Sequence, residues 1–480
     1  MSKEFDEELF LKGGMVDNYF ELNKRGDIIP SSLDSSTLSK DIRKAFHIIT
    51  MRDNLDIYIY NEKLGYYEGN GKQILREIVK KVIEDYYSEK NANATINHIT
   101  TSTVRNRDEL DPPTNILSVK NGLLNIDREK TTLLEHSPTW FFTENIPVSY
   151  DPNAKCPEFL RFLEQIQPDY NNRAKIQEIF GYCLWREYPH QVSFLLIGGG
   201  SNGRSTLLAV LRALLGGRKN VSSETLQSLC HDKFSKAELY LKYANICGDL
   251  PSKAIKDTSA FKMLCGGDSI SAQKKHRDPF NFVNYAKLIF LPNRVPYSYD
   301  DSDAYYRRWV MIFFPVRFGI QMGDLPVDKH ILEKLTTPEE LSGILNWALE
   351  GLKRLREQKE FTNRMTIEQT KQYYERLVSP LSAFIQDKII VTFDPENFIT
   401  KEEFYSSFLD YCKEKKIIAP TYENVGRLMK KVSKGIGAGH KTIFGKQRYV
   451  WTGCQYNLTE EELQAREREI IDVVYREAQT

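Results

Sequence analysis

The residues between positions 195 and 208 have the types and spacing of a loop that holds phosphate. They read LLIGGGSNGRSTLL, which places Gly198, Gly203, Arg204 and Ser205 in the pattern G-x-x-x-x-G-[K]-[ST]. Glycines let backbone N–H groups converge on phosphate oxygens, and the positive end of a following helix strengthens the attraction. Because an apolar strand precedes the loop and an apolar helix follows it, a glycine turn with only a structural role is the weaker interpretation.

For this loop we expect ATP as the ligand, with Mg²⁺ held in part by the Ser205 hydroxyl. The expected cofactor-binding residues are Gly198, Gly200, Ser201, Asn202, Gly203, Arg204, Ser205 and Thr206. Arg204 stands where such loops carry lysine, and its longer, planar side chain keeps the charge but changes the geometry. Binding is therefore expected to survive better than hydrolysis, which depends on positioning. A natural divergence with compensation nearby and an engineered change that traps a nucleotide-bound state both stay open as its origin.

Two polar residues at the ends of apolar strands could complete the site. Asp249, near the end of YANICGDL, is expected to hold Mg²⁺, although a lone Asp at a strand end is often a cap or turn former. Asn293 ends YAKLIFLPN and could orient water or sense the γ-phosphate, with a simple Asx turn as the alternative. Since Gly248 and Leu250 flank Asp249, no residue is assigned as the general base.

Two adjacent arginines, Arg307 and Arg308, open the apolar strand WVMIFF. Neighbouring residues on a strand face opposite ways, so we expect one arginine to be structural and the other to reach a phosphate across a subunit interface. The predicted catalytic residues are thus Arg204, Asp249, Asn293, Arg307 and Arg308.

Two clusters of basic residues could contact a phosphate backbone. The stretch SISAQKKHR places Lys274, Lys275 and His276 at an expected tip, where a merely solvated loop is the alternative. Residues 413–448 contain ten Lys or Arg and only two Glu, although such a charged face can also serve solubility alone. On a predicted helix and hairpin there, the expected DNA-binding residues are Lys430, Lys431, Lys434, Lys441, Lys446 and Arg448.

The alternation of strands and helices predicts an α/β fold with a parallel sheet. The strands are VSFLLI, YANICGDL, YAKLIFL and WVMIFF, separated by helical crossovers. Residues 1–150 are expected to form a mixed region with a hairpin at 56–69, and residues 155–187 two amphipathic helices. The α/β domain is placed at 151–365, including a helical lead-in and lid. Residues 378–480 follow the order helix, helix, hairpin, which is typical of a small winged-helix domain.

Composition limits the class of protein. The chain has 480 residues, 41% hydrophobic residues and a net charge of +1, which fits a globular chain of about three domains. There is no apolar run near the ~18 residues of a membrane span and no secretory signal, so a reducing cytoplasm, prokaryotic or virus-infected, is expected. Seven cysteines without a CxxC pair predict neither structural zinc nor a disulfide framework.

Over most of residues 45–355, the chain resembles the superfamily-3 helicases in the order and spacing of these motifs. The resemblance is to the poxvirus-like primase–helicase group of phages, plasmids and archaeal viruses. The stretches that carry the resemblance are NVSSETLQSLCHDKFSKAELYLKYANICGDLPS and FKMLCGGDSISAQKKHRDPFNFVNYAKLIFLPNRVPYSYDDSDAYYRRWVMIFFP. The resemblance implies an AAA+ P-loop ATPase core behind a mostly helical collar. It also implies a ring, usually a hexamer, that hydrolyses ATP between subunits and moves 3′ to 5′ on single-stranded DNA, with Lys274, Lys275 and His276 facing the channel.

Relatives in that group are often fused to a primase. Here Asp53-x-x-Asp56 is too weak a signal for a primase metal site, so we expect no DNA synthesis by this polypeptide and a separate or fused primase as a partner. The leading hypothesis is an ATP-dependent replicative helicase of a plasmid or virus that acts on single-stranded and forked DNA. The alternatives are a nucleotide-responsive DNA-binding scaffold or initiator whose hydrolysis Arg204 weakens, and a DNA packaging or remodelling motor.

Overall fold

The chain folds into two compact units. The computed structural model describes residues 10, 12, 15–127, 130–248, 250–251, 253–292, 295–319, 325–415, 419–432, 435–443 and 445–457. The first unit comprises residues 1–251, 256–293 and 300–364, and the second comprises residues 252–255, 294–299 and 365–480. Two short segments of the second unit, of four residues (252–255) and six residues (294–299), each follow a strand of the central sheet in the first unit.

The amino-terminal part of the first unit combines three helices with a four-stranded sheet. The helices are α2 (Ser35–Ala45), α3 (Gly71–Ile83) and α4 (Glu89–Ser102), and the sheet order is β3-β2-β1-β4. Its strands are β1 (Ile48–Met51), β2 (Ile57–Asn61), β3 (Tyr66–Glu68) and β4 (Val104–Arg105). Antiparallel pairing of β2 with β3 confirms the predicted hairpin. A second, antiparallel sheet follows, made of β5 (Ile116–Val119), β6 (Gly122–Ile126) and β7 (Thr131–Leu134).

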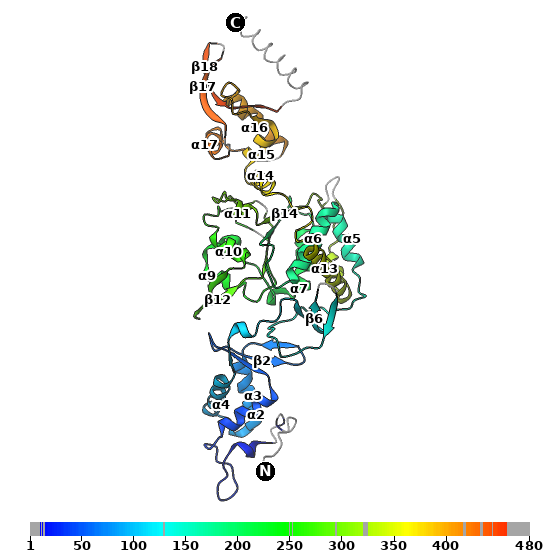
Figure 1. The fold of residues 1–480 in the computed structure, drawn as a ribbon, viewed down its shortest axis with the longest axis vertical. Coiled ribbons are helices and arrows are strands. Elements are labelled where there is room, and N and C mark those ends of the chain that lie inside the picture. The colour runs from blue at the N-terminus through cyan, green and yellow to red at the C-terminus, as the bar shows by residue number, and fades with distance from the viewer. Residues whose placement is uncertain are drawn as a thin grey trace. The chain divides into compact units, whose positions relative to one another are not determined.

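The central sheet of the first unit is parallel throughout, as predicted. Its order is β14-β8-β13-β10-β9, from β8 (Ser193–Ile197), β9 (Val221–Ser222), β10 (Ala244–Cys247), β13 (Lys287–Phe290) and β14 (Trp309–Phe313). Helices flank it, with α10 (Ser259–Gly266) on one side and α6 (Tyr170–Leu184) and α13 (Pro338–Gln358) on the other (Figure 1). Burial on both faces explains why its strands read as continuous apolar runs.

Further helices belong to the first unit. They are α5 (Pro157–Ile166), α7 (Arg204–Leu215), α8 (Leu226–His231), α9 (Lys233–Ala237), α11 (Asp303–Tyr306) and α12 (Ile331–Leu335). A two-stranded hairpin, β11 (Ser269–Gln273) with β12 (Pro279–Val283), extends from this part of the chain.

The second unit follows the predicted order of helices and hairpin. Its helices are α14 (Ile367–Val378), α15 (Pro380–Lys388), α16 (Lys401–Glu414) and α17 (Tyr422–Val432). A three-stranded sheet of order β16-β18-β17 contains β16 (Phe398–Thr400), β17 (Gly437–Ile443) and β18 (Lys446–Thr452). A separate pair joins β15 (Ile389–Val391) to β19 (Cys454–Tyr456). Phe384, Phe404, Phe408 and Trp451 form its buried core.

Helices α6 and α13 pack against each other at backbone distance. A Cβ atom added at Gly181 would lie 2.3 Å from the Ala348 carbonyl oxygen, and one added at Gly351 would lie 2.4 Å from the Gln177 carbonyl oxygen. Only glycine permits this approach. The prediction that α6 is amphipathic is wrong, because every residue from Ala174 to Leu184 is buried and this part of the helix is enclosed on all sides.

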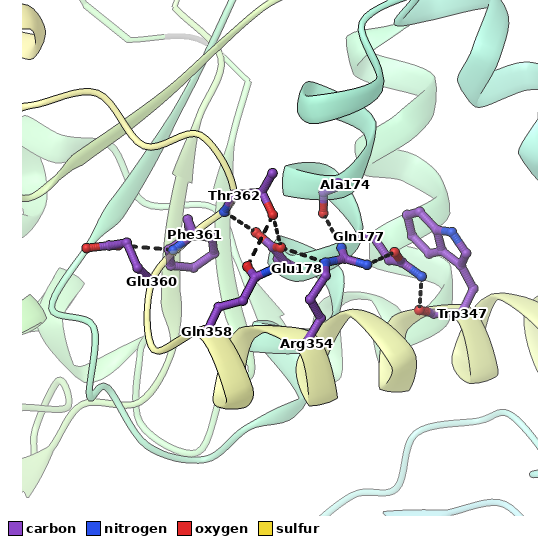
Figure 2. A network of polar contacts seen from close by, with 9 residues as sticks. All are labelled: Ala174, Gln177, Glu178, Trp347, Arg354, Gln358, Glu360, Phe361 and Thr362. Atoms are coloured by element: carbon purple, nitrogen blue, oxygen red, sulfur yellow. Dashed lines mark hydrogen bonds and ion pairs between the residues drawn. The ribbon is translucent and has the colours of Figure 1, made fainter.

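A buried polar network fastens these two helices to the segment that follows α13. The Glu178 carboxylate is fully buried and accepts hydrogen bonds from Arg354 Nε at 2.8 Å, the Thr362 amide at 2.8 Å and the Thr362 hydroxyl. Figure 2 shows Arg354 reaching the Gln177 side chain and the Ala174 carbonyl as well, at 2.7 Å each. A buried carboxylate is stable only with such partners.

All seven cysteines are buried and free. Among the described residues, no helix combines the length and the apolar character that crossing a membrane requires.

Replacing Glu178 with Gln should destabilise the first unit by about 3 kcal/mol, because Arg354 would lose its charge partner in a buried site. Chemical denaturation followed by circular dichroism measures the change. Glu360→Gln is the matched control, since Glu360 pairs with Arg364 on the surface and its loss should cost at most about 0.5 kcal/mol. Equal effects of the two substitutions would contradict the role given to Glu178.

Candidate functional site

The glycine loop lies between β8 and α7, at the carboxyl end of a strand inside the parallel sheet. Gly200 and Gly203 have φ angles of +89° and +78°, which glycine adopts without strain. At Gly203 an added Cβ would also lie 2.4 Å from Ile166 Cγ2, so the start of α7 approaches α5 closely. Added Cβ atoms at Gly199 and Gly200 would meet nothing within 4 Å, so the crest of the loop is open to a ligand.

The guanidinium of Arg204 points into the protein beneath this loop. Its NH1 donates to the Leu196 carbonyl at 2.8 Å and to the Pro292 carbonyl at 3.4 Å, and its NH2 donates to the Gly198 carbonyl at 2.7 Å. Its Nε donates to Asn202 Oδ1 at 3.0 Å. The side chain therefore joins the end of β8, the glycine loop and Pro292, which lies two residues after β13.

Burial defines the electrostatics of Arg204. The residue is only 5% exposed, and desolvation lowers the pKa of its guanidinium. Arginine stays protonated in proteins, so the charge is retained and is stabilised by carbonyl dipoles instead of a carboxylate. In this conformation Arg204, the predicted phosphate-binding residue, donates its hydrogen bonds to acceptors of the protein itself.

Other loop residues fit a nucleotide phosphate and a metal ion. Ser205 is exposed and Thr206 is half-buried at the start of α7. In the first turn of a helix the backbone N–H groups have no hydrogen-bond partner within the helix, so they can bind an anion. Asn202 is buried, and its Nδ2 has no hydrogen-bond partner within the described part of the chain. An open backbone crest, an orphaned amide and an exposed hydroxyl are groups that phosphate oxygens and Mg²⁺ can satisfy.

A cavity of about 510 Å³ lies beside the loop. Ser201, Gly203 and Thr206 line its inner side, and Phe162 and Phe318 contribute aromatic side chains. The Phe318 amide donates to the Ser201 carbonyl at 2.6 Å, which fixes this wall against the loop. The sequence analysis missed the cavity; the apolar spacing in α5 indicated only a packing face, and Phe318 carried no motif.

The two arginines before β14 have different surroundings. Both precede the strand instead of opening it, since α11 ends at Tyr306 with Arg307 as its C-cap and β14 begins at Trp309. Arg308 is 7% exposed and donates to the carbonyls of Ala304 and Lys262. Arg307 is half-buried and donates to Gln191 Oε1 at 3.0 Å. Arg308 thus has the contacts of a structural residue, and Arg307 is the more accessible of the two.

Arg364 connects this position to the buried network of Figure 2. Its guanidinium donates to the Arg307 carbonyl and forms an ion pair with Glu360 at 2.8 Å. Thr362, two residues earlier, is bound to Glu178. The fixed segment after α13 therefore holds the backbone of Arg307.

Hairpin β11–β12 presents the predicted basic tip. Lys274, Lys275 and His276 lie in its turn and are exposed, and His276 has a φ angle of +60°. The hairpin confirms the predicted geometry, whereas contact with DNA stays a prediction.

The turn of this hairpin, which also carries the basic tip, contacts the amino-terminal region. Arg277 pairs with Asp56 at 3.5 Å. Arg107 pairs with Asp53 and lies 5.0 Å and 5.7 Å from the ring centres of Tyr240 and Phe280. Asp53 and Asp56 are thus engaged by arginines, which gives the Asp53-x-x-Asp56 pattern a structural explanation. No cluster of three or more potential metal ligands occurs within the described residues.

The basic residues of the second unit differ in their partners. Lys430 on α17 and Lys446 on β18 are exposed. Lys441 pairs with Glu396 at 2.9 Å and Arg448 pairs with Glu402 at 3.1 Å, so their charges are balanced locally. Three predicted residues, Asp249, Asn293 and Lys434, lie outside the described residues, as does the side chain of Lys431.

Two families match parts of the chain. Residues 34–168 match the family described as "D5 N terminal like", and residues 196–308 match one described as "Family of unknown function (DUF5906)". The first match ends just after α5, and the second runs from the end of β8 to the residue before β14.

Three viral proteins are similar at low identity. The "Putative helicase L207/L206" of Acanthamoeba polyphaga mimivirus is 24% identical over 270 residues, covering 52% of this chain and 28% of that protein. The "Putative helicase 184R" of Invertebrate iridescent virus 6 is 21% identical over 420 residues, covering 78% and 40%. A "Putative primase" of African swine fever virus is 23% identical over 194 residues, covering 38% and 20%.

The chain therefore spans less than half the length of these relatives. A solved structure of the apo NrS-1 C terminal region aligns with 89% of this chain and all of that one, at 11% identity and a TM-score of 0.47. The "D5 N terminal like" match and the viral relatives together support a primase–helicase family.

Replacing Arg204 with Lys should lower the free energy of unfolding of the first unit by about 2 to 4 kcal/mol in the absence of nucleotide. One ammonium cannot reach the Leu196, Gly198 and Pro292 carbonyls together, and lost charged hydrogen bonds cost about 1.5 to 3 kcal/mol each. Thermal and chemical denaturation measure the change. Arg161→Lys, at an exposed pair with Glu158, should stay within about 0.5 kcal/mol; an equally small change at Arg204 would contradict the fastening role.

Proposed function

We propose that this chain is an ATP-driven DNA helicase of a viral or plasmid replication system, with an AAA+ core of superfamily 3. The observation that carries the proposal is one arrangement within the first unit. It combines an open glycine loop at the carboxyl end of β8 with an exposed basic hairpin, Lys274 to His276. Ligands of parallel α/β sheets bind beyond the carboxyl ends of the strands, which is where the loop lies.

The loop amides, with Ser205 and Asp249, would hold the phosphates and Mg²⁺, and Asn293 would sense the terminal phosphate. ATP, when bound, supplies free energy through transfer of its terminal phosphoryl group to water. The neighbouring cavity, with Phe162 and Phe318 in its walls, has room for a nucleoside. The β-strand order supports this assignment, because β8 is flanked by β13 and β14, whose carboxyl ends lie at the same edge.

Arg307 is the proposed arginine that completes a neighbouring subunit's site. Strands β14 and β8 are parallel over five residue pairs, so Arg307 lies at the amino edge of the sheet and the glycine loop at the carboxyl edge. Five residues span about 15 Å, which is beyond the reach of one side chain. Arg307 can therefore serve the loop of another copy but not its own, which favours a ring in which sites form between subunits.

The basic hairpin and the second unit support DNA as the polymer along which the protein moves. A basic tip follows phosphates without reading base sequence, and strong salt dependence is its expected signature. The helix, helix and hairpin of the second unit support a winged-helix type of DNA-binding domain, with Lys430 and Lys446 as exposed cations. Because the viral relatives carry helicase and primase names, a primase, separate or fused, is the proposed partner in the cytoplasm of an infected or plasmid-bearing cell.

Arg204 favours a second candidate function. Its guanidinium is satisfied by four protein acceptors, so it has no need of a phosphate. A loop held in this way could bind nucleotide through its amides and fail to hydrolyse it. The chain would then be a nucleotide-responsive DNA-binding scaffold.

Steady-state ATP hydrolysis by the full chain, with and without single-stranded DNA, tests the proposal. We expect DNA to stimulate hydrolysis and Arg307→Ala to lower it by 10²-fold or more, since such arginines contribute about 10³ to 10⁵. The same variant should bind nucleotide as the parent does. Mixing Arg307→Ala with Ser205→Ala should restore part of the activity, because each variant supplies the group that the other lacks.

Two outcomes would overturn parts of this proposal. Nucleotide binding without hydrolysis, by both the parent chain and Arg204→Lys, would leave the scaffold function in its place. Hydrolysis that persists in Arg307→Ala, or that mixing fails to restore, would exclude a site shared between subunits.

A further inference from the structure

The hairpin of the second unit has two faces of different chemistry. Strand β18 is the middle strand, with Tyr449 opposite His440 and with Arg448 opposite Lys441 on β17. Directly opposed residues share a face and successive residues alternate. Tyr449, His440 and Trp451 therefore lie on one face, and Arg448 and Lys441 lie on the other.

The arginine face is balanced in charge. Lys441 pairs with Glu396 and Arg448 pairs with Glu402. A phosphate that approached these cations would meet a carboxylate beside each of them. This face is therefore the poorer candidate for contact with a polyanion, although it holds two of the cations that the sequence singled out.

The tyrosine face combines an exposed ring with a cation. Tyr449 is 63% exposed, whereas Trp451, two residues along the strand, is 4% exposed in the core. The His440 ring lies 4.5 Å from the Tyr449 ring, centre to centre. Lys401 Nζ lies 4.4 Å from the Trp451 ring centre and 5.6 Å from that of Tyr449. On this face the Lys401 ammonium thus lies between the buried Trp451 ring and the exposed rings of Tyr449 and His440.

Lys401 has no carboxylate partner among the described residues. It is the first residue of α16, where the helix dipole disfavours a cation by about 0.3 to 1 kcal/mol. Helix stability therefore does not explain its position.

We propose that Tyr449, His440 and Lys401 form a platform that binds an unpaired base of single-stranded DNA. Every nucleobase has a π face that stacks on an aromatic ring, and a neighbouring cation attracts the phosphate that follows the base. In a duplex the base faces are covered by their neighbours, so the platform distinguishes single strands from duplex. The inference goes beyond the proposed helicase track at Lys274 to His276, because it rests on the second unit alone.

Fluorescence of a short oligonucleotide that contains 2-aminopurine, titrated with the full chain without nucleotide, tests the platform. We expect the parent chain to quench the base by stacking. Tyr449→Ala should weaken binding roughly tenfold and reduce the quenching, whereas Tyr449→Phe, which keeps the ring, should retain both. Lys401→Gln should weaken binding several-fold and reduce the slope of log Kd against log salt by about one.

Tyr170→Ala is the matched control. Tyr170 on α6 is 73% exposed and has the Arg173 guanidinium 5.9 Å from its ring centre, but no aromatic ring among the described residues pairs with it. Its loss should leave binding unchanged. The proposal is overturned if Tyr449→Ala binds as the parent does, if Tyr449→Phe fails as badly as Tyr449→Ala, or if duplex binding falls equally. Because nucleotide is absent, a chain that never hydrolyses ATP still gives a clear result.

Discussion

The Arg204 guanidinium is the point at which three parts of the central sheet are joined. It binds the carbonyl before the end of β8, a carbonyl inside the glycine loop and the carbonyl after β13. Buried backbone carbonyls need hydrogen-bond donors, and Arg204 supplies donors to all three. Lysine offers one nitrogen at a single point, whereas the planar guanidinium reaches several acceptors at once. Through this side chain the glycine loop is joined to the ends of β8 and β13, and the guanidinium is committed to the protein instead of to a ligand.

A parallel sheet separates the chemical groups of the first unit by a physical rule. All strand ends of one kind lie at one edge, so the glycine loop and Arg307 are held apart by the length of a strand. Each edge has its own support. At the carboxyl edge it is Arg204, and at the amino edge it is the segment from Glu360 to Arg364, anchored by the buried Glu178 carboxylate (Figure 2). A catalytic site that draws on both edges needs two copies of the chain.

Local patterns predicted much of the fold. Apolar runs located β8, β10, β13 and β14, and the glycine spacing located the loop and the start of α7. The basic hairpin and the helix, helix and hairpin of the second unit were also predicted. Enclosure of α6 was missed because its residues are shielded by α13, and the glycine contacts that allow this lie about 170 residues apart.

Partners that are distant in sequence could not be predicted from spacing. The ion pairs of Asp53 with Arg107 and of Asp56 with Arg277 join separate regions, and so do the pairs of Lys441 with Glu396 and Arg448 with Glu402. The same holds for Arg204, since one of its acceptors, Pro292, lies 88 positions away. In each case the residue type was noticed, but its partner depends on the tertiary fold.

Calorimetric titration of the chain and of Arg204→Lys with a slowly hydrolysed ATP analogue and Mg²⁺ tests the central claim directly. If the guanidinium is committed to backbone carbonyls, the lysine chain gains a free ammonium for the phosphates, and it should bind the analogue more tightly than the parent. Weaker binding by Arg204→Lys would mean that the arginine itself contacts the phosphates. That result would contradict the claim that the Arg204 guanidinium is bound only to carbonyls of the protein.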